Sequence, residues 1–303
     1  MFNTFAVVEP ILVPGIILPG GGECLLARML NYKDMISFLE TSTFNQTDVE
    51  NCKRARIKEM AEKGIRVPED CETLNEAVSL AHASHEHRQK YVDQDGKPRH
   101  LNKIVLGEGK HVVAVFKSGI HDKNYLTIRS AMHIVGDPDV PKEKIVVVGG
   151  IYFKEGIQGI CHLQNLTLRQ ANGCDGVDGW SSFTMEDVLV EQCEYNGVIV
   201  HGADARCTDV EVRQCGGSGM FAAGWGGNSA SITLIRANTK VHDNCTDDER
   251  WNYGLLVGDS STIQLVFPLT KEQVSFDNDG GGNWGAEDDG EASINQIKTI
   301  IAT

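Results

Sequence analysis

Five segments in the C-terminal part of the chain resemble one another in register, and this repeat is the strongest constraint on the fold. They are LTLRQA from Leu166, VLVEQC from Val188, VEVRQC from Val210, TKVHDN from Thr239 and VSFDND from Val274. The first three begin 22 residues apart, a suitable length for one coil of a solenoid. A second, glycine-marked strand follows each of the first four, as DGV, NGVIV, SGMFA and YGLLV.

Alignment of the five segments places residues in columns. One column is apolar and consists of Leu168, Val190, Val212, Val241 and Phe276. A second column, at a predicted bend, consists of Ala171, Cys193, Cys215, Asn244 and Asp279. Stacked coils would bury the first column as a continuous apolar ladder.

Short β-branched segments extend the pattern toward the N-terminus, as in KIVLGEGKH, YLTIRS and KIVVVGG. We therefore expect a mainly β fold, a right-handed parallel β-helix over residues 101–303 with about six or seven coils. The alternative all-β architecture is a sandwich of antiparallel hairpins. It would not require successive segments to resemble one another in register.

Residues 1–90 show a different period and are expected to form a helical N-terminal region that caps the β-helix. Apolar residues recur at helical spacing from Leu25 to Leu39. A second helix is predicted after Thr47, ending at Gly64. A third begins at Thr73, and Glu76 three residues later predicts a capping box.

Composition restricts the class of partner. The formal net charge of −14 argues against nucleic-acid binding, which requires a basic face. No stretch approaches the roughly 20 apolar residues that span a bilayer, so no membrane association is expected. The nine cysteines are scattered without zinc-site spacing, so we expect reduced thiols and a cytoplasmic or nuclear protein.

Two groups of sequence motifs resemble those of known families. ETLNEAV followed by KIVLGEGKH, LTI and HIVGD resembles the opening of the pectin-lyase-like β-helix superfamily, in which a capping helix covers the end of the barrel. The segment from Cys24 to Phe44, CLLARMLNYKDMISFLETSTF, is similar to the helical F-box of intracellular proteins that carry a β-helix for substrate recognition. That resemblance implies a Skp-type linker protein as partner and a role in a ubiquitin-ligase adaptor.

An enzymatic site was sought in NGCDGVDGWSS, which contains Asp175 and Asp178 and is followed by His201. The segment resembles the Asn-Thr-Asp-Gly-Ile-Asp motif of polygalacturonase-like glycosidases. The paired acids that those enzymes carry one coil later are replaced here by Gln192-Cys193, so the acid and base pair is incomplete. Asp175 and Asp178 are therefore interpreted as turn residues. A lyase would need a basic residue near carboxylates, and the sequence around Arg213 does not indicate such a group.

The histidine cluster HASHEHR contains His82 and His85 at a spacing that suits one helix face. Such a pair can bind zinc, but no third ligand is indicated. We therefore expect no metal site. No cofactor is predicted.

Acidic and aromatic residues gather near the C-terminus. From Asp243 to Glu291 there are twelve Asp or Glu and only two basic residues. Insertions in a stacked fold emerge as loops, often on the binding face. The predicted binding residues in these loops are Trp225, Asp247, Asp248, Glu249 and Trp251.

The sequence therefore predicts a non-catalytic scaffold that binds a protein partner through one face of a β-helix. The alternative is a carbohydrate-active enzyme, a hydrolase, lyase or epimerase, on the same fold. Its weak catalytic candidates are Asp175, Asp178 and His201. A third possibility is a purely structural β-helix, since fold alone does not determine function.

Overall fold

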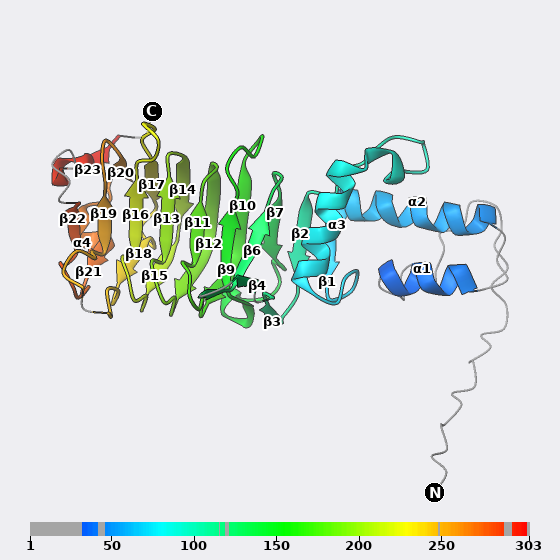
Figure 1. The fold of residues 1–303 in the computed structure, drawn as a ribbon, viewed down its shortest axis with the longest axis horizontal. Coiled ribbons are helices and arrows are strands. Elements are labelled where there is room, and N and C mark those ends of the chain that lie inside the picture. The colour runs from blue at the N-terminus through cyan, green and yellow to red at the C-terminus, as the bar shows by residue number, and fades with distance from the viewer. Residues whose placement is uncertain are drawn as a thin grey trace, which may run out of the picture.

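The computed structural model describes residues 32–41, 46–114, 116–118, 121–247, 249–287 and 293–301. Within these ranges the chain is mainly β, with long parallel sheets and few helices (Figure 1). The strands are stacked side by side along the long axis, and the helices α1 and α2 lie beyond one end of the stack. No helix in the described ranges is long and apolar enough to cross a bilayer.

Two sheets contain most of the strands. The larger, of 14 strands, runs through β1 (Ile65–Val67), β2 (Lys103–Leu106), β7 (His133–Gly136), β10 (Cys161–Arg169), β12 (Phe183–Glu191), β14 (Asp204–Thr208), β17 (Ser231–Ile235), β20 (Thr262–Val266) and β23 (Ile297–Ile300), and includes β3 (Gly109–Val112), β8 (Ile145–Val148), β15 (Glu211–Arg213), β18 (Lys240–His242) and β21 (Ser275–Phe276). The smaller, of seven strands, contains β6 (Tyr125–Ile128), β9 (Gly150–Phe153), β11 (Val177–Gly179), β13 (Val198–His201), β16 (Met220–Ala223), β19 (Leu255–Val257) and β22 (Trp284–Ala286).

The chain alternates between the two sheets, and neighbouring strands within each sheet are parallel. Leu166 of β10 pairs with Val188 of β12, one repeat later. The antiparallel sandwich is therefore wrong. The one described antiparallel strand pair is the short hairpin of β4 (Phe116–Ser118) and β5 (His121–Lys123).

The apolar column of the repeat is a buried ladder, as predicted. Leu168 pairs with Val190, Val190 with Val212 and Val212 with Val241, and all four are fully buried. We call these four residues the valine column. A second set, the glycine column, comes from the glycine-marked strands and consists of Gly176, Gly197, Gly219 and Gly254.

The glycine column packs directly against the valine column. A Cβ atom placed on Gly197 would lie closer than 3.0 Å to the side chain of Val212 and to the carbonyl oxygen of Gly219. Gly176 meets Val190 in the same way, and Gly219 meets Val241. Glycine recurs at these positions because no side chain fits between the two columns.

The last coil is shifted by one residue from the predicted columns. Val241 pairs with Ser275, not with Phe276, and Phe276 stacks instead on His242 with ring centroids 5.1 Å apart. Asn278, not Asp279, stands beside Asn244, whose side-chain amide donates to the Asn278 Oδ1 over 3.0 Å. The prediction aligned Phe276 by its apolarity, but its ring points outward and small Ser275 faces the glycine column.

The N-terminal helices differ in how they join the core. The N-cap of α3 (Leu74–Glu86) is Thr73, whose hydroxyl accepts a hydrogen bond from the Glu76 amide, which is one of the two hydrogen bonds of the predicted capping box. Residues of α2 (Gln46–Lys63) such as Ile57 and Met60 belong to the main apolar core. α1 (Tyr32–Thr41) contributes Met35 to a separate small cluster. The rest of the predicted segment Cys24–Phe44 lies outside the described residues.

His82 connects α3 to the sheets. Its side chain is 5% exposed, and Nε2 accepts a hydrogen bond from the Arg129 amide over 3.1 Å. Burial, assisted by the charge of Arg129, lowers the pKa of His82 from 6.5 to about 4. Protonation would charge a buried ring and remove its acceptor.

We expect acid to destabilise the fold through His82. Its contribution is complete above pH 6.5 and is lost as the pH falls toward 4, because the unfolded state binds the proton first. Over this interval the wild-type protein should lose roughly 2 to 3 kcal/mol more than His82→Gln, which retains a neutral acceptor. Urea unfolding of both proteins across this pH range measures the difference. Parallel pH profiles would contradict the assignment.

Candidate functional site

Asp175 holds a turn between strands. Its Oδ2 accepts a hydrogen bond from the Tyr125 hydroxyl over 2.9 Å, and its Oδ1 accepts from the backbone amide and the side-chain amide of Asn196 over 2.9 and 2.8 Å. Asn196 repeats the arrangement one coil later, where its Oδ1 accepts from the Ser218 amide. Burial, followed by the charge of Asp175, raises the pKa of Tyr125. The contacts therefore give Asp175 a structural role.

Asp178 is not the turn residue that the sequence predicted, because it lies within strand β11, where it stands beside His201 on the outer face of the smaller sheet. His201 Nε2 is 3.6 Å from Asp178 Oδ1, and the imidazole stacks on Trp180 with ring centroids 4.2 Å apart. Burial lowers the pKa of His201. Trp225, which is 60% exposed, packs its ring edge-on against Trp180 at 5.2 Å. The structure thus brings three residues of the predicted sites, Asp178, His201 and Trp225, around Trp180.

A row of outward side chains leads away from this cluster. Strand register aligns Asp178 with Ile199, Ile199 with Phe221 and Phe221 with Leu256. Side chains in register on adjacent parallel strands share one face of a sheet. The row therefore extends from the cluster formed by Asp178, His201, Trp180 and Trp225 to the strands β16 and β19.

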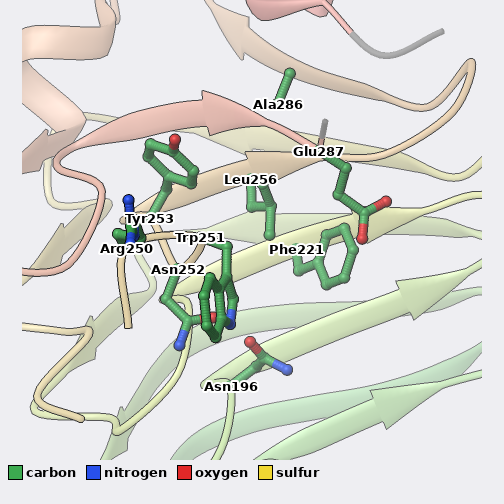
Figure 2. A pocket seen from close by; sticks show the side chains of 9 residues that line it. All are labelled: Asn196, Phe221, Arg250, Trp251, Asn252, Tyr253, Leu256, Ala286 and Glu287. Carbon is green, nitrogen blue, oxygen red and sulfur yellow. The ribbon is translucent and has the colours of Figure 1, made fainter. Parts of the chain in front are cut away.

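A groove of about 810 Å³ lies over these strands (Figure 2). We call it the aromatic groove. Phe221 and Leu256 belong to the outward row, and Trp251 and Tyr253 come from the segment before β19. Its lining residues are Asn196, Phe221, Arg250, Trp251, Asn252, Tyr253, Leu256, Ala286 and Glu287.

Glycines shape the groove by leaving room for larger side chains. A Cβ on Gly285 or Gly281 would overlap the ring of Tyr253. A Cβ on Gly258 would overlap the carboxylate of Glu287. The ring of Tyr253 therefore packs against the backbone of Gly281 and Gly285, and the carboxylate of Glu287 packs against that of Gly258. Substitution of these glycines would displace both side chains.

The predicted acidic residues have different positions. Asp247 closes the loop before β19, since its two carboxylate oxygens accept from the Asn252 side chain over 3.1 and 3.2 Å. Glu249 is exposed, and its carbonyl oxygen accepts from the Asn252 amide. Asp248 lies outside the described residues. Trp251 lines the groove and is 64% exposed, whereas Trp225 is not among the lining residues.

Sequence reasoning missed Phe221, Tyr253 and Glu287. Phe221 and Tyr253 stand in the repeat segments SGMFA and YGLLV, so an analysis of the outward positions of these strands would have found them. Glu287 was counted only as part of an acidic run. Its position over Gly258 depends on the pairing of β22 with β19.

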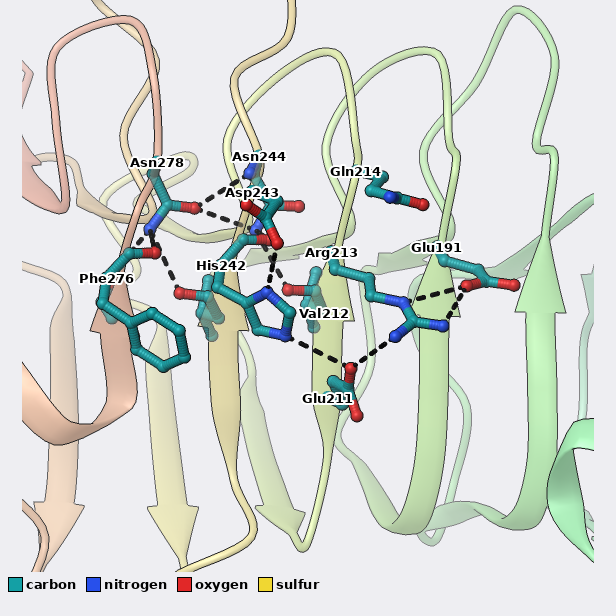
Figure 3. A network of polar contacts seen from close by, with 12 residues as sticks. Glu191, Glu211, Val212, Arg213, Gln214, His242, Asp243, Asn244, Phe276 and Asn278 are labelled. Carbon is teal, nitrogen blue, oxygen red and sulfur yellow. Dashed lines mark hydrogen bonds and ion pairs between the residues drawn. The ribbon is translucent and has the colours of Figure 1, made fainter.

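Arg213 is grouped with carboxylates, contrary to the sequence interpretation (Figure 3). Its guanidinium donates to Glu191 over 2.8 and 3.0 Å and to Glu211 over 3.0 Å. Glu211 also contacts His242 Nε2 at 3.2 Å. Hydrogen bonding to Glu191 raises the pKa of Arg213. A base must be able to lose its proton, so this network favours a structural ladder over a lyase site.

The histidine cluster of α3 is divided by the fold. His82 accepts from the Arg129 amide, whereas His85 stacks on His100 with ring centroids 4.5 Å apart. Among the described residues no group of three or more His, Cys, Asp or Glu is arranged to hold a metal ion.

Comparison of the chain with models of protein families, with curated proteins and with solved structures finds no match.

We expect Asp175→Ala to destabilise the protein by about 2 to 4 kcal/mol, because it leaves the Tyr125 hydroxyl and the Asn196 amides without their acceptor. Asp175→Asn, which keeps one acceptor oxygen, should lose less. Urea unfolding measures both changes. An Asp175→Ala protein as stable as the wild type would refute the structural role and favour the enzymatic alternative.

Proposed function

We propose that this chain is a non-catalytic recognition protein that binds a basic peptide segment of a protein partner in the aromatic groove. The scaffold we propose is a right-handed parallel β-helix of the pectin-lyase-like type, formed by residues 101–303 and capped by the helical region 1–90. Parallel strands that alternate between two sheets at a repeat of about 22 residues support this architecture.

The exposed indole of Trp251 is the observation that carries the proposal. It is 64% exposed although it lines a groove that also contains Phe221 and Tyr253. Tryptophan and tyrosine in a pocket are typical anchors of protein interfaces, because they bury large areas with little loss of side-chain entropy.

The acidic composition of the chain between Asp243 and Glu291 favours a basic ligand. Glu287 lines one side of it. The chain from Asp243 to Glu291 contains twelve acidic residues and two basic ones, and one of these two, Arg250, also lines the groove. Such a field attracts a Lys- or Arg-containing segment and raises its association rate.

The carbohydrate-active alternative draws support from Asp178, which lies beside His201 and Trp180 on the same face. A hydrolase would need a second carboxylate at about 5 to 10 Å from the first. The hydrogen bonds of Asp175 favour recognition over catalysis, because they commit that carboxylate to a turn.

We expect Trp251→Ala to weaken the binding of basic peptides at least tenfold without lowering the melting temperature, because an exposed indole contributes to binding and little to the core. An array of Lys- and Arg-rich peptides, each with one aromatic or aliphatic anchor, supplies the ligands. Fluorescence anisotropy then measures their affinity.

Trp225→Ala is the matched control, since Trp225 is equally exposed but does not line the groove. It should leave peptide affinity unchanged. If Trp251→Ala lowers stability and leaves binding intact, the groove is not the site. Binding to a glycan array, without peptide binding, would favour the carbohydrate-active alternative.

We further propose that Cys24–Phe44 is an F-box-like module that binds a Skp-type linker. The protein would then be a cytoplasmic or nuclear ubiquitin-ligase adaptor. The described part of this segment, α1, supports it because Met35 packs with Val49 and Cys52 in a cluster distinct from the main core. α2 belongs to the main core through Ile57 and Met60.

We expect deletion of residues 1–44 to abolish binding to a purified Skp-type linker and to leave the sheets folded, because Ile57 and Met60 are retained. Pull-down measures the binding, and circular dichroism with thermal melting measures the fold. A full-length chain that does not bind the linker would refute the adaptor role.

A further inference from the structure

A second groove lies on the larger sheet, toward its N-terminal end. Its volume is about 760 Å³. Strand register aligns Lys103 of β2 with His133 of β7, His133 with His162 of β10, and His162 with Thr184 of β12. All four line the groove, so three cationic or titratable side chains stand in one row.

The two imidazoles are close and fixed. The rings of His133 and His162 are 5.6 Å apart and meet edge to face. His162 Nδ1 is 2.6 Å from the Thr184 hydroxyl oxygen, and that hydroxyl donates to the Cys161 carbonyl. His162 Nε2 lies 3.4 Å from Gln164 Oε1, so both ring nitrogens face a protein oxygen and the orientation of the imidazole is fixed.

This row has no counter-charge from the protein. Within the described ranges no carboxylate forms an ion pair with Lys103, His133 or His162. Asp187, the carboxylate that lines the groove, is paired with Lys142 over 2.6 Å. Burial, followed by the charges of His162 and Lys103, lowers the pKa of His133. A row of basic side chains without ion pairs is conspicuous in a chain of net charge −14.

We propose that this groove binds a doubly charged oxyanion, the phosphate group of a small phosphate ester, between Lys103, His133 and His162. Lys103 and His133 supply donors, and His162 adds positive charge to the row when it is protonated, which suits an anion with several acceptor oxygens and a charge of two. The groove exceeds the volume of a phosphate group, and Ile160, 57% exposed at its rim, offers an apolar surface to the ester's organic part. This site is independent of the aromatic groove.

Histidine NMR signals of the full chain test the proposal. Inorganic phosphate and phenyl phosphate are titrated near the ordinary imidazole pKa of about 6.5, with chloride used to hold ionic strength constant. The His133 and His162 signals should shift saturably with either probe. A phosphate ester, with a second pKa of about 6, is more fully ionised at this pH than inorganic phosphate, so affinities are compared for the dianions. Tighter binding of the phenyl phosphate dianion identifies an ester site, and equal binding of the two dianions identifies a site for free phosphate.

Substitutions distinguish phosphate binding at this groove from a nonspecific effect of the protein's charge. His133→Gln, His162→Gln and Lys103→Met should each weaken phosphate binding about tenfold, because each removes a group that carries a positive charge when protonated, and Lys103→Arg should retain it. His242→Gln is the matched control, since His242 already contacts Glu211 and Asp243. The proposal is overturned if chloride produces the same shifts, or if variants with unchanged melting temperatures bind phosphate as the wild type does.

Discussion

The contact between the glycine column and the valine column is the constraint on which the rest of the structure depends. Gly176, Gly197 and Gly219 each leave no space for a Cβ beside the valine of the next repeat, and Gly254 leaves none beside Ser275. A side chain there would overfill a dry core, which typically costs about 1 to 3 kcal/mol per site. The two sheets can approach closely only while successive repeats keep the same register, so this contact constrains how the parallel strands pair.

Fixed stacking also determines what lies on the outside. Side chains alternate between core and solvent along a strand, so constant register places outward residues of successive coils in rows. One row runs from Asp178 through Ile199 to Phe221, which lines the aromatic groove. Another aligns His133 with His162. Constant register thereby brings outward residues from different repeats next to one another on the surface.

Prediction from the sequence succeeded where the repeat is regular. The apolar ladder through Val190, Val212 and Val241 was predicted correctly, because buried positions repeat with the coil. It was wrong in the last coil, where Phe276 turns outward and stacks on His242. An aromatic residue can face the core or the solvent, so the residue type alone does not determine the strand register.

The sequence by itself determined a parallel stack of strands, the buried column, and the start of α3 at Thr73. These properties depend on local spacing and on repeated burial, which are visible in the chain. Only the tertiary structure decided that Asp175 secures a turn while Asp178 faces His201, and that Trp225 and Trp251 belong to different surroundings. Those outcomes depend on loops of unequal length and on contacts between residues that are far apart in the sequence. Such contacts do not recur at a fixed spacing, so the repeat in the sequence does not reveal them.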